Sequence, residues 1–302
     1  MSTGTISVSL AAGAVALALV TISSAASLRL IAPRWHSRKD GQLQRIYEDA
    51  DGVATAETTA AYSTTGPKIA ICLLTLLGLG VSVALAVLST LDSNEGFFLE
   101  NWFNAAGWVL ISLQALAVVY ARAPGMTYDL GIYGSVSAWF LLGGQCAQSI
   151  ILAQVRSDIG PLPTFILRVA QLILTTAGGL ANLTIPRRPG VFIDGSRPID
   201  AMNTNSALSK YSFEWCNAVL RFAAKKGTLN MSDLPSLNAD TRSADLAASW
   251  TRANLPGSLM LRIFLTHKWA FAGQWALAFV QAFGNFAPQF VLPRPGRARA
   301  PR

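Results

Sequence analysis

Residues 69–91 read IAICLLTLLGLGVSVALAVLSTL, a run of 23 positions without a charged side chain. An α-helix rises about 1.5 Å per residue, so about 20 apolar residues cross the roughly 30 Å of hydrocarbon in a bilayer. Backbone groups inside the hydrocarbon must be hydrogen-bonded within the segment, and a helix satisfies this requirement. The stretch therefore predicts a transmembrane helix, and it determines the class of the whole chain.

Five further stretches have the same character. Together with the quoted run they predict six spans, at 6–31, 69–91, 102–120, 130–152, 165–185 and 269–292. Arg168 is the one charged residue expected well inside any of them. The composition agrees, because 52% of the residues are hydrophobic and only 13% are charged. We expect an all-α integral membrane protein with a five-helix N-terminal bundle, a cytoplasmic linker with amphipathic helices, and one further transmembrane helix.

The net charge of +8 is distributed unevenly among the connections. Basic residues crowd the first connection and the polar insert after the fifth span, whereas residues 92–101 hold no Lys or Arg. The third and fourth connections carry one arginine each, Arg122 and Arg156, and do not discriminate. Since basic loops stay cytoplasmic, we expect the N-terminus outside the cytoplasm and the insert inside. The charge is then a topology signal, and no nucleic-acid partner is expected.

The first span is expected to be an uncleaved anchor. Residues 1–5 hold no basic residue and the apolar run is long, although Ser24-Ala25-Ala26 leaves a cleaved signal peptide as the alternative. The three cysteines and two histidines show no metal-ligand spacing, and no nucleophile and base are suitably arranged. We therefore expect neither a metal site nor an enzyme active site in this chain.

Small and amide side chains predict how the spans pack. Gln145 and Gln148 are expected to point inward as hydrogen-bonding contacts between helices. Arg168, about one turn inside the outer end of its span, is expected to extend to the interface. Pairs of small residues four apart let helix backbones approach closely in lipid. These pairs are Ala12 and Ala16, Gly134 and Ala138, and Gly143 and Ala147.

The insert from 186 to 256 contains no long apolar run. Apolar residues at spacings of three and four predict an amphipathic helix over 211–226, with Ser212 as its N-cap and Gly227 at its end. Trp215 and the neighbouring basic residues suit a helix that lies on the inner membrane surface. Two further helices are predicted at 243–252 and 258–266.

Short motifs follow one another through this insert. They are Arg197-Pro198-Ile199-Asp200, Tyr211-Ser212-Phe213-Glu214-Trp215 and Ser232-Asp233-Leu234-Pro235, followed in the last span by Asn285-Phe286-Ala287-Pro288-Gln289. In order and spacing they resemble the linker and first core helix of ABC transporters of the multidrug-resistance-associated (C) subfamily, in the manner of fungal vacuolar conjugate and bile-acid exporters. The linker motif residues are Ser212, Phe213, Trp215, Asp233, Leu234 and Pro235.

The resemblance implies a division of the chain into four parts. Residues 1–185 would be an N-terminal five-span domain, 186–256 the linker, 257–292 an elbow helix with the first helix of an incomplete core domain, and 293–302 an atypical basic tail. A shifted reading frame and a genuine short protein are both open as explanations of that tail. The resemblance further implies a truncated portion of such an exporter.

The function implied is ATP-driven export of amphipathic organic anions, conjugates or secondary metabolites. ATP and Mg²⁺ would belong to the rest of the exporter, because no Gly-x-x-x-x-Gly-Lys-Ser/Thr loop occurs in this sequence. We therefore expect no cofactor in this chain and no transport by the chain alone. Its partners would be the lipid bilayer, further core helices and nucleotide-binding domains, in a vacuolar or plasma membrane.

Gln274, Gln281 and Asn285 stand seven and four apart in the last span. They share one helical stripe, which could face a substrate path or could form packing hydrogen bonds with further helices. A different class of function is also open: the chain could be a stand-alone membrane module that anchors or binds a partner. An unrelated small receptor is disfavoured by the insert that carries the motifs.

Overall fold

The computed structural model describes residues 3–36, 47–91, 98–155, 162–193, 197–230, 233–253 and 258–291. The expected basic tail at 293–302 and Arg156 lie outside these ranges. The chain divides into two compact units, Met1–Ala239 and Asp240–Arg302, and each is described by itself. The four-part division expected from the sequence stays a prediction. The first compact unit ends at Ala239, which lies inside the expected linker of 186–256.

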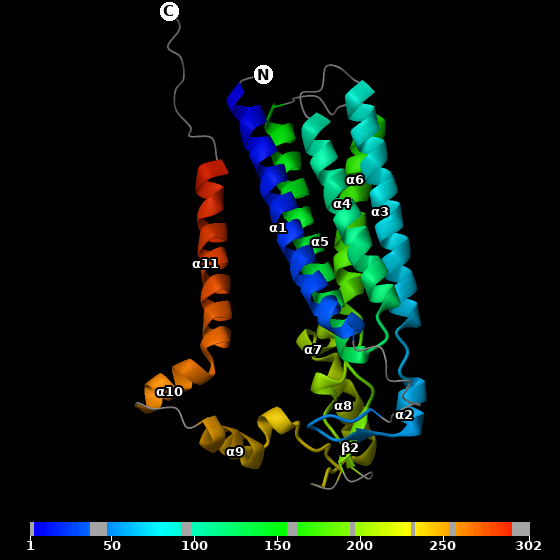
Figure 1. Cartoon of the computed structure of the whole chain (residues 1–302), viewed down its shortest axis with the longest axis vertical. Helices are drawn as coiled ribbons and strands as arrows, with labels where there is room; N and C mark the ends of the chain where they lie inside the picture. The colour runs from blue at the N-terminus through cyan, green and yellow to red at the C-terminus, as the bar shows by residue number, and fades with distance from the viewer. Residues whose placement is uncertain are drawn as a thin grey trace, which may run out of the picture. The chain divides into compact units, whose positions relative to one another are not determined.

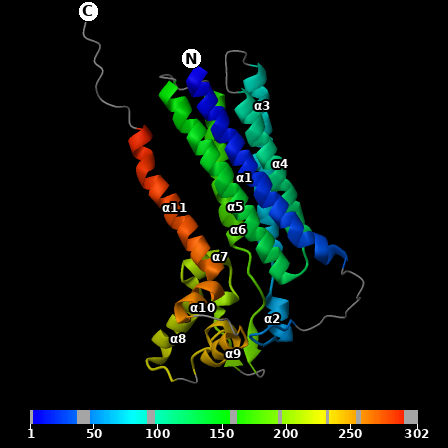
Figure 2. The same ribbon diagram turned by 60° about the vertical axis from the view of Figure 1, so that its left-hand side comes forward.

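Five helices form a bundle in the first unit (Figures 1 and 2). They are α1 Thr3–His36, α3 Thr65–Leu91, α4 Phe98–Tyr120, α5 Pro124–Val155 and α6 Leu162–Leu183. Each contains a stretch long and apolar enough to cross a membrane. The prediction of an all-α protein embedded in a membrane is confirmed at this level, and the orientation of the bundle stays a prediction.

Glycines set the closest approaches in the bundle. A Cβ atom placed on Gly78 of α3 would lie 2.2 Å from Cη2 of Trp108, whose side chain is fully buried in α4. A Cβ on Gly144 of α5 would lie 2.6 Å from Cβ of Ala16 in α1. These positions accept only glycine unless the helices move apart, as expected for helices that pack in lipid by van der Waals contact.

The predicted small-residue pairs have two different environments. A Cβ on Gly134 would meet the side chain of Asn182 in α6, at 2.8 Å from its Oδ1, so this face does pack against another helix. Gly143 and Ala147 instead line an open apolar groove of about 420 Å³ between α1 and α5, together with Ala12 and Ala16. A Cβ on Gly143 would meet nothing within 4 Å.

Hydrogen bonds between side chains link all five helices of the bundle. Gln145 and Gln148 are buried and take part, which confirms the predicted inward orientation. One bond joins each of the helix pairs α1–α4, α4–α5, α5–α6 and α3–α6. The donor and acceptor residues are Gln114 to Ser24 (3.0 Å), Asn104 to Gln148 (2.6 Å), Thr175 to Gln145 (2.9 Å) and Gln171 to Ser82 (3.1 Å).

The start of α4 differs from the prediction. The sequence predicts Glu100 and Asn101 in the connection before the third span, but both lie in the first turn and a half of α4, so this boundary is wrong. The helix begins at Phe98, and Glu100 is only 3% exposed. A carboxylate in the first turn interacts favourably with the positive end of the helix dipole, which helps the segment to remain helical. Arg168 lies half-buried in α6.

A small sheet joins distant parts of the first unit. It contains β1 Val53–Ala54, β2 Val191–Ile193 and β3 Arg197–Pro198 in the order β1-β2-β3, with both pairs antiparallel. Ala54, Val191 and Ile199 form its buried apolar core. The short helix α2, Ala56–Ala61, follows β1 and begins with a capping box between Thr55 and Thr58.

The linker after the sheet folds into short helices. They are η1 Ala201–Asn203, α7 Ala207–Tyr211, η2 Glu214–Cys216 and α8 Asn217–Lys226. The prediction of one helix over 211–226 is therefore wrong at its start. Ser212 is the C-cap of α7 rather than an N-cap, and Phe213 has a left-handed backbone at φ 59°. Gly227, at φ 76°, ends α8 as predicted.

The second unit contains η3 Ala239–Thr241 at its boundary, α9 Ser243–Ala253, α10 Leu259–Thr266 and α11 Lys268–Val291. The helices predicted at 243–252 and 258–266 are confirmed, and Ser258 caps α10 through the backbone N–H of Leu261. The predicted sixth span is helical as α11. It is not among the five helices apolar enough to cross a membrane, because Gln274, Gln281 and Asn285 lower its hydropathy.

Candidate functional site

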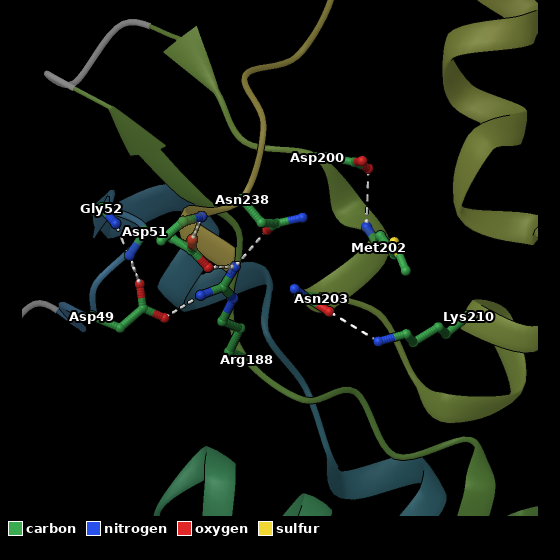
Figure 3. Close-up of polar contacts among 10 residues, drawn as sticks. Asp49, Asp51, Gly52, Arg188, Asp200, Met202, Asn203, Lys210 and Asn238 are labelled. Atoms are coloured by element: carbon green, nitrogen blue, oxygen red, sulfur yellow. Dashed lines mark hydrogen bonds and ion pairs between the residues drawn. The ribbon is translucent and has the colours of Figure 1, made fainter. Parts of the chain in front are cut away.

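The principal polar site lies where the linker leaves the bundle, and Arg188 is its centre. The Arg188 side chain is 6% exposed and forms ion pairs with Asp49 and Asp51 of the first connection. Its Nη2 atom also donates to Oδ1 of Asn238 at 3.2 Å. Figure 3 shows the guanidinium between the two carboxylates and Asn238. We call Arg188, Asp49, Asp51 and Asn238 the linker clamp.

A tight turn holds the two aspartates of the clamp. The Asp49 carboxylate accepts the backbone N–H of Asp51 at 2.9 Å and that of Gly52 at 3.3 Å. A Cβ on Gly52 would lie 2.3 Å from the carbonyl oxygen of Phe192 in β2, so this turn can approach the sheet only with glycine. The Asp51 carboxylate also accepts the N–H of Ala239. The turn thereby ties the first connection to both ends of the linker segment between Arg188 and Ala239.

The electrostatics of the clamp favour its charged state. Burial alone disfavours a charged guanidinium, but the hydrogen bonds to Asp49 and Asp51 outweigh this and raise the pKa of Arg188. Burial likewise opposes ionisation of Asp49, but the hydrogen bond and charge of Arg188 and the backbone N–H groups of Asp51 and Gly52 together outweigh it, so the pKa of Asp49 is lowered. Charged partners at such a site stabilise each other, and removal of one leaves the other buried without compensation.

Backbone hydrogen bonds close the linker next to the clamp. The N–H of Ser236 donates to the carbonyl oxygen of Pro198 at 2.9 Å, and the N–H of Asp200 donates to that of Ser236 at 2.9 Å. Arg197 donates to the carbonyl oxygen of Leu234 through Nε (3.3 Å) and Nη2 (3.2 Å). The segment that carries α7 and α8 is therefore a loop whose two ends meet at the sheet.

Two further contacts lie next to this region: one joins the first connection to the start of the linker, and one joins α3 to the residue after α4. The Tyr62 hydroxyl donates to the carbonyl oxygen of Pro186 at 3.2 Å, and Lys68 Nζ donates to that of Ala121 at 2.6 Å. A pocket of about 270 Å³ lies between Thr58, Tyr62, Arg188 and Gly190. We call β2 and β3 together with Arg188 the linker base. It is fixed to the first connection, which continues into α3.

The residues predicted from the sequence fall into three groups. Asp233 pairs with Lys226, Leu234 accepts from Arg197, and Pro235 lies half-buried between them and Ser236, so this motif belongs to the linker closure. Ser212, Phe213 and Trp215 lie at the joint between α7 and α8 and are not part of the clamp. The third group, Gln274, Gln281 and Asn285, is exposed on α11 in the second unit.

Sequence reasoning missed the clamp itself. Arg188 counts there only as one of several topology charges, and Asp49 and Asp51 receive no role. The available signal was the pair of acids before a glycine, Asp49-Ala50-Asp51-Gly52, in an otherwise basic connection. Among the described residues no group of three or more His, Cys, Asp or Glu side chains could hold a metal ion. In the clamp a guanidinium occupies the position between the carboxylates.

Comparisons with known proteins identify no relative: no family model, no curated protein and no solved structure matches this chain.

Proposed function

We propose that this chain is the membrane domain and linker of an ATP-driven exporter of amphipathic organic anions, conjugates or secondary metabolites. In this proposal the five-helix bundle anchors the linker in the membrane, and the linker docks on the core that carries out transport. The order of the linker motifs supports the assignment to the multidrug-resistance-associated type. A vacuolar or plasma membrane, with the N-terminus outside the cytoplasm, is part of the same proposal.

The linker clamp is the observation that carries the proposal. A linker needed only as a covalent tether has no use for a buried arginine with two carboxylate partners, since burying those charges costs free energy unless their geometry is maintained. The clamp instead fixes the two ends of the segment that carries α7 and α8, and this segment exposes apolar side chains, among them Leu220 and Phe222. Such an exposed, partly apolar surface is suited to contact with another membrane domain.

Reconstitution with a transport core tests the proposal. The chain would be co-expressed with a core of the multidrug-resistance-associated subfamily that lacks its own N-terminal domain, and ATP-dependent uptake of a dinitrophenyl glutathione conjugate into inside-out vesicles would be measured. We expect co-purification with the core and uptake above that of the core alone. The Arg188→Met variant should lose both effects. Absence of co-purification with the intact chain would contradict the proposal.

A stand-alone membrane module is the second candidate, and the bundle interior favours it. The helices are linked pairwise by hydrogen bonds between their own side chains. The groove between α1 and α5 is apolar and opens to the outside of the bundle. In the reconstitution experiment this candidate corresponds to binding of a membrane partner with unchanged uptake.

A further inference from the structure

The joint between α7 and α8 combines several unfavourable features. Phe213 is the one non-glycine residue with positive φ among the described residues, at φ 59° and ψ 17°. Left-handed backbone is unfavourable for a residue with a Cβ atom, most of all for a bulky one. Burial of the aromatic ring does not compensate for it, because Phe213 is 67% exposed and the neighbouring Tyr211 is 80% exposed.

The helix start after this joint also has no capping side chain. α7 begins at Ser206, whose hydroxyl accepts the N–H of Ser209 at 3.2 Å. By contrast, neither Phe213 before η2 nor Cys216 before α8 makes a side-chain capping bond. The first N–H groups of a helix need such partners or water. Two of these groups have backbone acceptors in place of a cap: the N–H of Cys216 donates to the carbonyl oxygen of Phe213 at 3.2 Å, and that of Asn217 donates to that of Glu214.

The sequence pattern fits a continuous helix across the joint. Phe213, Cys216, Leu220 and Ala223 follow one another at spacings of three and four, the period of one helical face. No proline or glycine interrupts the chain between Ser206 and Gly227. The local sequence therefore favours one continuous helix, whereas the structure contains two separate helices, α7 and α8.

Contacts at the two ends keep the helices apart. On the α7 side, Lys210 Nζ donates to Oδ1 of Asn203 at 3.0 Å, and α7 packs against α6. On the α8 side, Lys226 forms an ion pair with Asp233, which also accepts the N–H of Asn230 at 2.9 Å. The second set is exposed, and exposed ion pairs contribute little stability. It is the weaker restraint.

We infer that α7 and α8 are two halves of a single helix with a hinge at Phe213, and that they exchange between the broken form and a straight form. The straight form relieves the backbone at Phe213 and moves the exposed side chains of α8, among them Leu220 and Phe222, to new positions. A partner that contacts α8 in one form shifts the population toward that form. The linker thereby has a conformational device for docking. Only the partner's identity rests on the proposed function.

A spin-label distance measurement on the full chain tests the hinge without any partner. Labels would be placed at Leu208→Cys and Lys225→Cys, with the native cysteines replaced by alanine. A straight helix separates these Cα atoms by about 26 Å, from 17 residues at about 1.5 Å each, and the broken form brings them closer. We expect a major short distance and a minor long one. A single short distance that no variant changes would overturn the inference.

Two substitutions at Phe213 should move the populations in opposite directions. Phe213→Gly tolerates the left-handed backbone and disfavours a helix interior, whereas Phe213→Ala favours the helix. The ratio of long to short distance should be at least roughly fivefold higher in the alanine variant than in the glycine variant. A ratio equal in both, or higher with glycine, would overturn the inference. Because Phe213 is exposed, neither change should unfold the bundle.

A third variant tests the weaker restraint. Asp233→Asn removes the charge that pairs with Lys226 and leaves the joint itself unchanged, so the long distance should increase. Glu57→Gln, on the exposed side of α2, serves as the matched loss of one carboxylate and should leave the distances unchanged. An increase with Glu57→Gln, or none with Asp233→Asn, would contradict the role of the restraint. Because no transport core is present, failure here is distinct from failure of the proposed function.

Discussion

The bundle and the linker base solve the same problem, the burial of polar groups, by different means. Inside the bundle the four side-chain hydrogen bonds that link the helices in pairs join neutral groups, as in the bond from Gln171 to Ser82. At the linker base the central contact is ionic, between Arg188 and two aspartates. Charges are costly in hydrocarbon, whereas next to the membrane they can be matched and partly solvated. Replacing a clamp charge should therefore have a larger effect than replacing a bundle amide.

The largest expected effect is that of Arg188→Met. The substitution leaves Asp49 and Asp51 partly buried without their cation, and the loss of one member of a buried ion pair costs about 3–5 kcal/mol. Hydrogen exchange of the amides in 49–54 and 236–239 should accelerate strongly, while the bundle amides keep their protection. Arg187→Met, at the exposed neighbour, is the control and should leave exchange unchanged. Equal protection in both variants would show that the ion pairs of Arg188 do not stabilise the clamp.

The next effect concerns the bundle and depends on shape rather than charge. Gly78→Val places atoms where the Trp108 ring lies, because a Cβ there would be 2.2 Å from that ring. Overpacking of this kind costs about 1–3 kcal/mol. Gly80→Val, on the same helix and with nothing within 4 Å of a Cβ, is the matched control. In detergent, the thermal unfolding midpoint of Gly78→Val should be lower than that of Gly80→Val. Equal midpoints would contradict the packing of α3 on α4.

Acid should weaken the clamp and spare the bundle contacts. The pKa of Asp49 is lowered from its ordinary value of 3.8 in the folded chain. A lowered folded-state pKa contributes stability that is full above the ordinary value and is lost as the pH falls from there through the folded-state pKa. Exchange at 49–54 should therefore accelerate below about pH 4. The neutral amide pairs do not titrate, so the bundle amides should keep their protection. A parallel loss of protection in the bundle would contradict the prediction.

The smallest effect should follow Gln171→Leu. This change removes one bond between α6 and α3, and hydrogen bonds between membrane helices contribute on average about 0.6 kcal/mol. The unfolding midpoint should move only slightly, and far less than with Gly78→Val. A loss of several kcal/mol with leucine would mean that the amide network dominates the bundle.

The bundle was predictable from the sequence because hydropathy reports the membrane directly. The same pattern gave Gln145 and Gln148 their inward orientation. The hydropathy pattern placed Glu100 in a loop, because a charged residue at the start of a helix cannot be distinguished from a loop residue by hydropathy. The break at Phe213 was not predictable, because local periodicity favours a helix and only contacts such as that of Lys210 with Asn203 override it. The clamp was hidden for a related reason: Asp49 and Arg188 are 139 positions apart, and no local pattern links them.

The binding of the linker base to the first connection can be measured directly by cross-linking. Val53 and Phe192 are paired residues of β1 and β2, so Val53→Cys with Phe192→Cys should form a disulfide on mild oxidation. The product is detected as two fragments that stay joined after proteolysis of the chain between them. A pair of Val53→Cys with Leu220→Cys on α8 is the negative control. We predict efficient cross-linking for the first pair alone. Its failure, with both thiols reactive toward maleimide, would contradict the account.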